Sequence, residues 1–253
     1  MGRMETETVT LPLVATCALG LEDVLGDELR ELGASAIKAD RGAVRFEGDH
    51  AVAYRCCLRS RVASRVLLKL RRFPVSDARA LYGGVHSIRW SDHIGANDTL
   101  RVDFVGGSEE IHDARFGAMK TKDGIVDRIR EDQGDRPNID LRAPDVRVRV
   151  HMREGHASVL LDLSGDPLFQ RGWRTDGGPA PLKETLASAL LRLAGWPEAA
   201  RHGKALVDPM CGSGTFLVEG AEMALGRAAG RNRSFGFERW RFYRYWLYRR
   251  WLN

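Results

Sequence analysis

Hydrophobic and polar positions along the first 50 residues follow a β-type pattern and then an α-type pattern. Apolar side chains occupy every second position over residues 9–17, which predicts a half-buried strand. Leucine and valine then recur on one helical face over residues 21–32, and Val44 with Phe46 predicts a further strand. A helix between strands of this kind is typical of a small ferredoxin-like unit, which we expect over residues 9–52.

Residues 54–73 combine a helical apolar stripe with a run of positive charge. Valine and leucine at positions 62, 66, 67 and 70 predict one continuous helix. The same stretch contains no acid and holds the cations Arg59, Arg61, Arg65, Lys69, Arg71 and Arg72. An exposed helix normally mixes charge signs, so this run predicts a phosphate-binding surface, to which we assign Arg59 and Arg65. A solvated basic helix without a nucleic-acid partner is the alternative.

Strand and helix patterns alternate over the next hundred residues. They predict a strand at residues 100–104, a helix over residues 117–130 and a β-hairpin over residues 146–163. The polar face of the hairpin is rich in arginine, which could guide RNA or keep an edge strand soluble. We expect residues 53–165 to form one α+β domain.

Positive charge also gathers where the predicted helix begins. Arg115, Lys120 and Lys122 precede or open this helix. Backbone N–H groups at a helix N-terminus, together with these cations, could hold an RNA phosphate. Asp123 and Asp127 could instead neutralise the two lysines locally.

The last third of the chain changes character twice. Residues 166–180 are rich in Gly, Pro and Arg without periodicity, which indicates a linker between domains. Pro181 then opens a predicted helix with leucines on one face. Over residues 205–218 an apolar run ends in an acid, a turn with two glycines follows, and a second helix begins. Strand, turn and helix predict the start of a doubly wound, Rossmann-like α/β domain over residues 181–253.

The glycine turn has the features of a ligand-binding loop. Gly212 and Gly214 lack a Cβ, so the backbone can turn sharply and approach a ligand, with free N–H groups at the helix N-terminus facing the same spot. Asp208, at the predicted carboxyl end of the strand, can accept hydrogen bonds from an ammonium or hydroxyl group. The motif is neither a Walker A loop nor G-x-G-x-x-G. A tight βα connection without a ligand is the alternative.

Composition narrows the functional class. The net charge of +5 and a pI near 9.2 favour a polyanionic partner. The four cysteines show no C-x-x-C spacing and the histidines no ligand spacing, so we expect no metal site. No apolar run approaches the roughly 20 residues of a membrane helix, and the N-terminus has no hydrophobic signal region. These features predict a cytoplasmic protein without a membrane partner.

Four motifs in order carry a family resemblance. Asp-Pro-Met-Cys-Gly-Ser-Gly-Thr at residues 208–215 resembles the first S-adenosylmethionine-binding motif of nucleic-acid amino-group methyltransferases. The segments 161–174 and 180–187 resemble the join between the RNA-binding and catalytic parts of that family, and residues 116–127 resemble its THUMP domain. Up to about Trp240, the chain is similar to the bacterial 23S rRNA guanine-N2-methyltransferases with an N-terminal THUMP region.

The resemblance implies a cofactor, a partner and site residues. The cofactor is S-adenosyl-L-methionine, and the expected cofactor-binding residues are Asp208, Pro209, Cys211, Gly212, Ser213, Gly214 and Thr215. The partner is 23S rRNA or its assembly intermediate, bound through the THUMP domain. The expected RNA-binding residues are Arg115, Lys120, Lys122, Arg59, Arg65 and, from the join, Arg171 and Arg174.

The resemblance also implies a segment that this sequence lacks. In the family, an Asn-Pro-Pro-Tyr type segment holds the flipped guanine, but the chain contains no Asn-Pro or Pro-Pro dipeptide. Only 42 residues follow Cys211, and the aromatic, arginine-rich tail of residues 240–253 departs from the family pattern after about Phe242. We therefore expect an incomplete methyltransferase domain that is inactive alone, and we assign no catalytic residue. The alternatives are a non-catalytic RNA-binding THUMP module and a fragment of a tRNA guanine methyltransferase.

Overall fold

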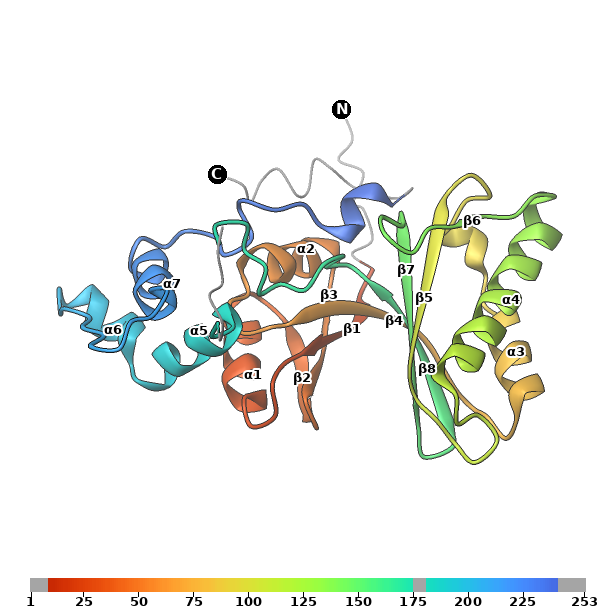
Figure 1. The fold of residues 1–253 in the computed structure, drawn as a ribbon, viewed down its shortest axis with the longest axis horizontal. Helices are drawn as coiled ribbons and strands as arrows, with labels where there is room; N and C mark the ends of the chain where they lie inside the picture. The colour runs from red at the N-terminus through yellow and green to blue at the C-terminus, as the bar shows by residue number, and fades with distance from the viewer. Residues whose placement is uncertain (1–8, 175–180, 241–253) are drawn as a thin grey trace. The chain divides into compact units, whose positions relative to one another are not determined.

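The computed structural model describes residues 9–174 and 181–240, which form two compact units (Figure 1). The first unit comprises the described residues of Met1–Val66 and Asp166–Ser234. The second comprises Leu67–Gly165 together with described residues that follow position 234. The chain therefore passes from one unit to the other more than once, and each unit is described separately below. The predicted features of residues 241–253 lie outside the described residues.

The first unit begins with a small antiparallel sheet and two helices. Strands β1 (Leu11–Thr16), β2 (Ser35–Asp40) and β3 (Ala43–Gly48) pair with β3 between the other two, and helices α1 (Glu22–Glu31) and α2 (His50–Arg59) accompany them. The core is made by alternate strand residues and by one face of α1, and includes Leu13, Ala15, Leu25, Leu29, Val44 and Phe46. The predicted strand, helix and strand of this region are confirmed.

The single helix predicted for residues 54–73 is wrong. Helix α2 ends at Arg59, Ser60 has extended backbone angles, and strand β4 runs over Arg65–Pro74. From Leu67 to Pro74, β4 pairs with strand β8 (His156–Asp162). The backbone groups of this segment therefore form hydrogen bonds with a neighbouring strand instead of within a helix. Spacing alone could not distinguish the two outcomes, because consecutive buried residues such as Val66 and Leu67 fit both patterns.

The second unit is a sheet whose long hairpin was predicted correctly. Its strands follow the order β4, β8, β7 (Val146–Arg153), β5 (Thr99–Gly106) and β6 (Asn138–Ile139). Strands β7 and β8 form the antiparallel hairpin, whereas β5 runs parallel to both β6 and β7. Helices α3 (Ala78–His86) and α4 (Ala114–Gln133) lie on the same side of this sheet (Figure 1). They enclose a core that includes Leu81, Trp90, Ile125, Val148 and Leu161.

The chain after the second unit is largely helical where it is described. It forms α5 (Glu184–Leu193), α6 (Trp196–Arg201) and α7 (Thr215–Ala224) in the first unit. The strand predicted at residues 205–207 is not formed, and Val207 is 80% exposed. A parallel strand needs a hydrogen-bonded neighbour, and no described strand pairs with this segment. No described helix is long and apolar enough to cross a membrane.

A short segment after α7 belongs to the second unit instead of the first. The 3₁₀ helix η2 (Gly236–Arg239) and the preceding Phe235 pack in that unit, where Phe235 and Phe237 are buried. The backbone N–H of Phe237 donates to the carbonyl oxygen of Leu163 at 3.1 Å. No periodic pattern of apolar residues predicted this return of the chain to the second unit.

Candidate functional site

The predicted cofactor turn adopts a conformation that requires glycine. Gly212 and Gly214 have φ angles of 52° and 73°, in the left-handed region that costs other residues about 1–2 kcal/mol. Gly214 is the N-cap of α7, and its N–H donates to the carbonyl oxygen of Cys211 at 2.7 Å. No neighbouring heavy atom would lie within 4 Å of a Cβ placed on either glycine. The turn is therefore accessible, and its glycines satisfy a backbone requirement instead of avoiding a clash.

The acid before the turn helps to shape it. Asp208 is partly exposed, and its Oδ1 accepts a hydrogen bond from the backbone N–H of Met210 at 3.1 Å. An Asp that bonds two residues ahead in this way fixes a local turn. Pro209, Met210 and Cys211 are all exposed, so the predicted cofactor residues present an open surface.

The N-terminus of α7 supplies the donors of the site. The first N–H groups of an α-helix have no acceptor within the helix, and the helix dipole places partial positive charge there. Two hydroxyl groups lie at the same end: Ser213 is exposed, Thr215 is buried, and their oxygens are 3.4 Å apart. This combination of N–H and hydroxyl donors is suited to a polar or anionic group of a ligand.

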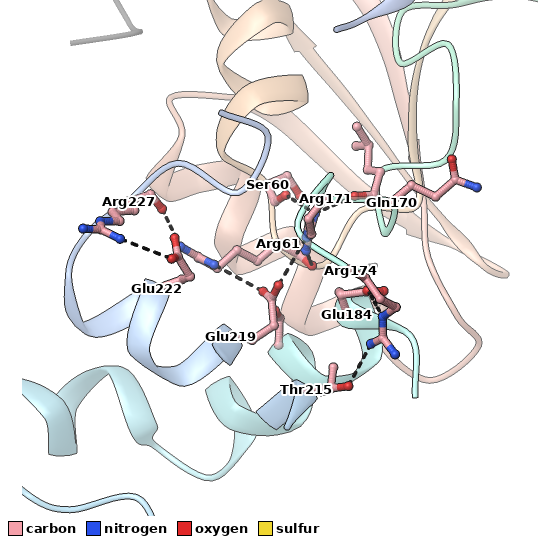
Figure 2. Close-up of polar contacts among 12 residues, drawn as sticks. Ser60, Arg61, Gln170, Arg171, Arg174, Glu184, Thr215, Glu219, Glu222 and Arg227 are labelled. Atoms are coloured by element: carbon pink, nitrogen blue, oxygen red, sulfur yellow. Dashed lines mark hydrogen bonds and ion pairs between the residues drawn. The ribbon is translucent and has the colours of Figure 1, made fainter. Parts of the chain in front are cut away.

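Arg174 contacts the cofactor turn directly and is not turned toward solvent. Its Nη2 donates to Thr215 Oγ1 at 2.8 Å and its Nη1 to Ser213 Oγ at 3.2 Å. The same guanidinium donates from Nε to Glu184 Oε1 at 2.7 Å (Figure 2). Its Nη2 also donates to the carbonyl oxygen of Leu182 at 3.1 Å. Arg174 therefore joins the beginning of α5 to the beginning of α7.

A buried ionic network holds the second turn of α7 (Figure 2). The carboxylate of Glu219 is 1% exposed and accepts from Arg61 Nη1 at 3.2 Å and from Ser188 Oγ at 2.5 Å. Arg171 Nε lies 3.5 Å from Glu219 Oε1, a distance that gives charge attraction without a hydrogen bond. Burial lowers the pKa of Arg61, and the charge of Glu219 opposes that shift.

The same arginines are bound to the ferredoxin-like part of the first unit. Arg171 donates to the carbonyl oxygens of Ser60, Arg61 and Leu168. Glu28 of α1 accepts from Ser60 Oγ at 2.6 Å and from the backbone N–H of Arg61 at 2.9 Å. Charges enclosed in this way need such partners, because an unpaired buried ion is strongly destabilising.

The residues predicted to bind RNA divide into three groups. Arg171 is 3% exposed and Arg174 is engaged with the cofactor turn, so the structure does not present either guanidinium to RNA. This corrects our prediction: the Gly- and Arg-rich composition of the join indicated an open linker, whereas residues 168–174 are packed against α5 and α7. Arg59 and Arg65 are partly exposed in the first unit, at the end of α2 and the start of β4.

The remaining three cations lie at the N-terminal part of α4, in the second unit. Arg115 is exposed, and its backbone N–H donates to Asp113 Oδ1 at 2.8 Å. Lys120 lies 5.8 Å from the centre of the Phe116 ring. Lys122 forms an ion pair with Asp123 at 2.7 Å, which is the local neutralisation that we gave as the alternative. Arg115 and Lys120 are thus the cations of this group for which no ion pair with a neighbouring acid is described above.

Sequence reasoning missed the acids that hold α7. Glu219 follows three apolar residues within a helix, and an acid in such a position signals a buried carboxylate with a cationic partner. Its partners Arg61 and Arg171 are far away in the sequence, so the pairing itself could not be read. In the described part of the chain, no cluster of three or more His, Cys, Asp or Glu residues could hold a metal ion.

Three family models match successive parts of the chain. The RlmL ferredoxin-like domain matches residues 12–67, the THUMP domain matches residues 75–162, and the RMKL-like methyltransferase domain matches residues 171–251. Together they account for the ferredoxin-like sheet, the second unit and the region that carries the glycine turn.

Similar proteins include a curated relative and solved structures. The ribosomal RNA large subunit methyltransferase K/L of Pseudomonas paraeruginosa is 52% identical over 229 residues, which are 90% of this chain and 32% of that protein. The structure of SMU.472, described as a methyltransferase and solved with SAH, aligns with a TM-score of 0.86 at 31% identity, over 96% of this chain and 63% of the other. A predicted N6-adenine-specific DNA methylase from Listeria monocytogenes gives the same TM-score at 29% identity, with the same coverage of both chains.

These findings agree with the fold and with the order of the motifs. The chain spans about a third of the length of the curated relative described above, which is therefore a much longer protein. From residue 12 to residue 251, this chain is thus similar in turn to an RlmL-like ferredoxin domain, a THUMP domain and an RMKL-like methyltransferase domain.

Proposed function

We propose that residues 208–215 bind S-adenosylmethionine. The observation that carries this proposal is the open turn in which Gly212 and Gly214 have left-handed backbone angles at the N-terminus of α7. Free N–H groups, two hydroxyls and the carboxylate of Asp208 give the mixture of donors and acceptors that an amino-acid group and a ribose require. The SAH bound in the structurally similar SMU.472 supports the same ligand class for this chain.

We further propose that the whole protein methylates the N2 amine of a guanine in 23S rRNA, which is the substrate that the family resemblance of the sequence implies. The curated relatives are named as ribosomal RNA large subunit methyltransferases, which supports this substrate. In this proposal the THUMP domain binds RNA, with Arg115 and Lys120 contacting phosphates, and Arg59 and Arg65 of the first unit each add a phosphate contact of their own. The RNA substrate is soluble and intracellular, so the protein would act in the cytoplasm.

Cofactor binding can be tested on this chain by titration calorimetry with SAH. We expect saturable binding, and we expect Gly212→Val to weaken it at least tenfold, because a β-branched residue is strained at this φ and projects into the space above the turn. Gly203→Val is the matched control, since Gly203 has a φ of 67° and equally open surroundings outside the turn. Equal affinity of both variants would refute the placement of the site.

Methyl transfer is the second test. The full-length protein should transfer a tritiated methyl group from S-adenosylmethionine to unmodified 23S rRNA. Nuclease digestion of the product should then release labelled N2-methylguanosine. Label in another base, or label that requires only tRNA, would contradict the proposed substrate.

A further inference from the structure

The segment before α5 holds α7 at two points one helical turn apart. Arg174 contacts Thr215, and Arg171 lies against Glu219 (Figure 2). Residues four positions apart share one face of a helix, so both arginines approach α7 from the same side. Because α7 begins directly after the glycine turn, this double contact fixes the place and rotation of the turn.

Arg174 also determines which way the two hydroxyl groups of the turn can donate. A guanidinium has donors only, so Ser213 Oγ and Thr215 Oγ1 must accept from it. Neither hydroxyl proton can then point at Arg174. One of the two can donate to the other across 3.4 Å, and the remaining proton is directed toward another acceptor.

The position of Arg174 is itself fixed by charge. Glu184 is buried and pairs with Nε, and the carbonyl oxygen of Leu182 accepts from Nη2. The guanidinium Cζ lies 5.2 Å from the centre of the Trp173 ring, which adds a cation–π contact. A side chain held at this many points loses little further freedom when a ligand binds beside it.

We propose that Arg174 is a positioning residue for the cofactor: it directs the one hydroxyl proton that remains on the Ser213–Thr215 pair toward the amino-acid end of the methyl donor. This inference rests on the proposed function of residues 208–215. The amino-acid end carries the only carboxylate of SAH, and a carboxylate is the acceptor that hydroxyl and N–H donors at a helix N-terminus favour. The adenosine end has no such charge, so the effect of Arg174 is confined to one end of the ligand.

The test compares two ligands in the same variants. SAH contains the amino-acid end, whereas 5′-methylthioadenosine lacks it. We expect Arg174→Ala to weaken SAH binding about tenfold and to change methylthioadenosine binding less than twofold, measured by calorimetry and by competition. Arg174→Lys should recover part of the affinity, because lysine keeps the charge but cannot contact Glu184, Ser213 and Thr215 together.

Arg192→Ala is the matched control. Arg192 lies on α5 and, like Arg174, pairs with an acid, Glu31 at 2.6 Å, but its described contact is not with the turn. It should lower the thermal midpoint without changing the ratio of the two affinities. Equal weakening of both ligands by Arg174→Ala would overturn the proposal, because it would show that the arginine only keeps the turn folded.

A failure of the proposed function gives a different result. If residues 208–215 do not bind the methyl donor, the unmodified chain binds neither SAH nor methylthioadenosine, and no variant changes that. If the chain binds both ligands and Arg174→Ala leaves both affinities unchanged, cofactor binding stands and the role of Arg174 is refuted.

Discussion

Replacement of Glu219 by glutamine tests whether the buried network is held by charge. The side chains of Glu219, Arg61 and Arg171 are 1%, 9% and 2% exposed, so the two guanidiniums have little access to water. Glutamine keeps the shape and one acceptor oxygen but removes the negative charge between them. Breaking a buried pair by removing one charge costs about 3–5 kcal/mol, and the retained oxygen places our expectation at the lower end, about 3 kcal/mol.

The assay is urea denaturation of the variant followed by far-UV circular dichroism, with the slope and midpoint fitted together. Glu198→Gln is the matched control, because Glu198 pairs with Arg201 on the solvent-exposed helix α6, and exposed pairs contribute little to stability. We expect no resolvable change for that control.

A double-mutant cycle with Arg61→Met separates the pair from the rest of the network. Arg61 and Glu219 should show a coupling free energy of about 1–3 kcal/mol. A loss below about 1 kcal/mol for Glu219→Gln, or strictly additive effects in the cycle, would refute the view that this ion pair fixes α7.

Three further predictions concern other parts of the chain. Burial and the nearby charge of Arg149 lower the pKa of His151, so the unfolded state binds the proton more readily and the second unit should lose stability as pH falls below about 6.5; His151→Gln should reduce that loss in pH-dependent denaturation. Gly172→Ala should destabilise the first unit by at least about 2 kcal/mol in urea, because its Cβ would lie 2.4 Å from the carbonyl oxygen of Asn232, whereas Gly155→Ala, with a φ of 68° and open surroundings, should cost only about 1 kcal/mol. Arg115→Ala should weaken binding of an rRNA fragment and reduce the slope of log K against log salt by about 1, and an unchanged slope would remove Arg115 from the phosphate contacts.

The sequence predicted those helices and strands whose residues form an unambiguous local pattern, and it failed where a distant segment decides the structure. The hairpin of β7 and β8 could be read because apolar and polar residues alternate on both sides of a glycine turn. The stretch after α2 could not be read, since the identity of β4 is decided by pairing with β8, which lies about ninety residues later in the sequence. The strand expected before the glycine turn failed for the same reason, because it has no paired neighbour among the described strands.

The candidate site shows the same division. The glycine turn was predictable because left-handed backbone angles favour glycine, so the turn is visible in the sequence as two closely spaced glycines. The arginines around it were identified, but their role was misread, since a run of Gly and Arg does not reveal a buried partner. Arg61 and Glu219 are 158 positions apart, and only the folded chain brings them within 3.2 Å.

The connectivity of the chain gives the buried arginines their significance. Residues 166–174 follow directly after the last strand of the second unit, and they hold α7 through Arg171 and Arg174. Ten residues separate the end of α7 from Phe235, where the chain enters the second unit again and where Phe235 and Phe237 are buried. The helix that carries the cofactor turn is thus preceded and followed by chain that continues into the THUMP domain. The polar contacts of α7 described above lie within the first unit, and Arg174 is the side chain at which the segment following the THUMP domain contacts the turn. The order of the chain therefore makes Arg174 the residue whose replacement separates that segment from the cofactor turn.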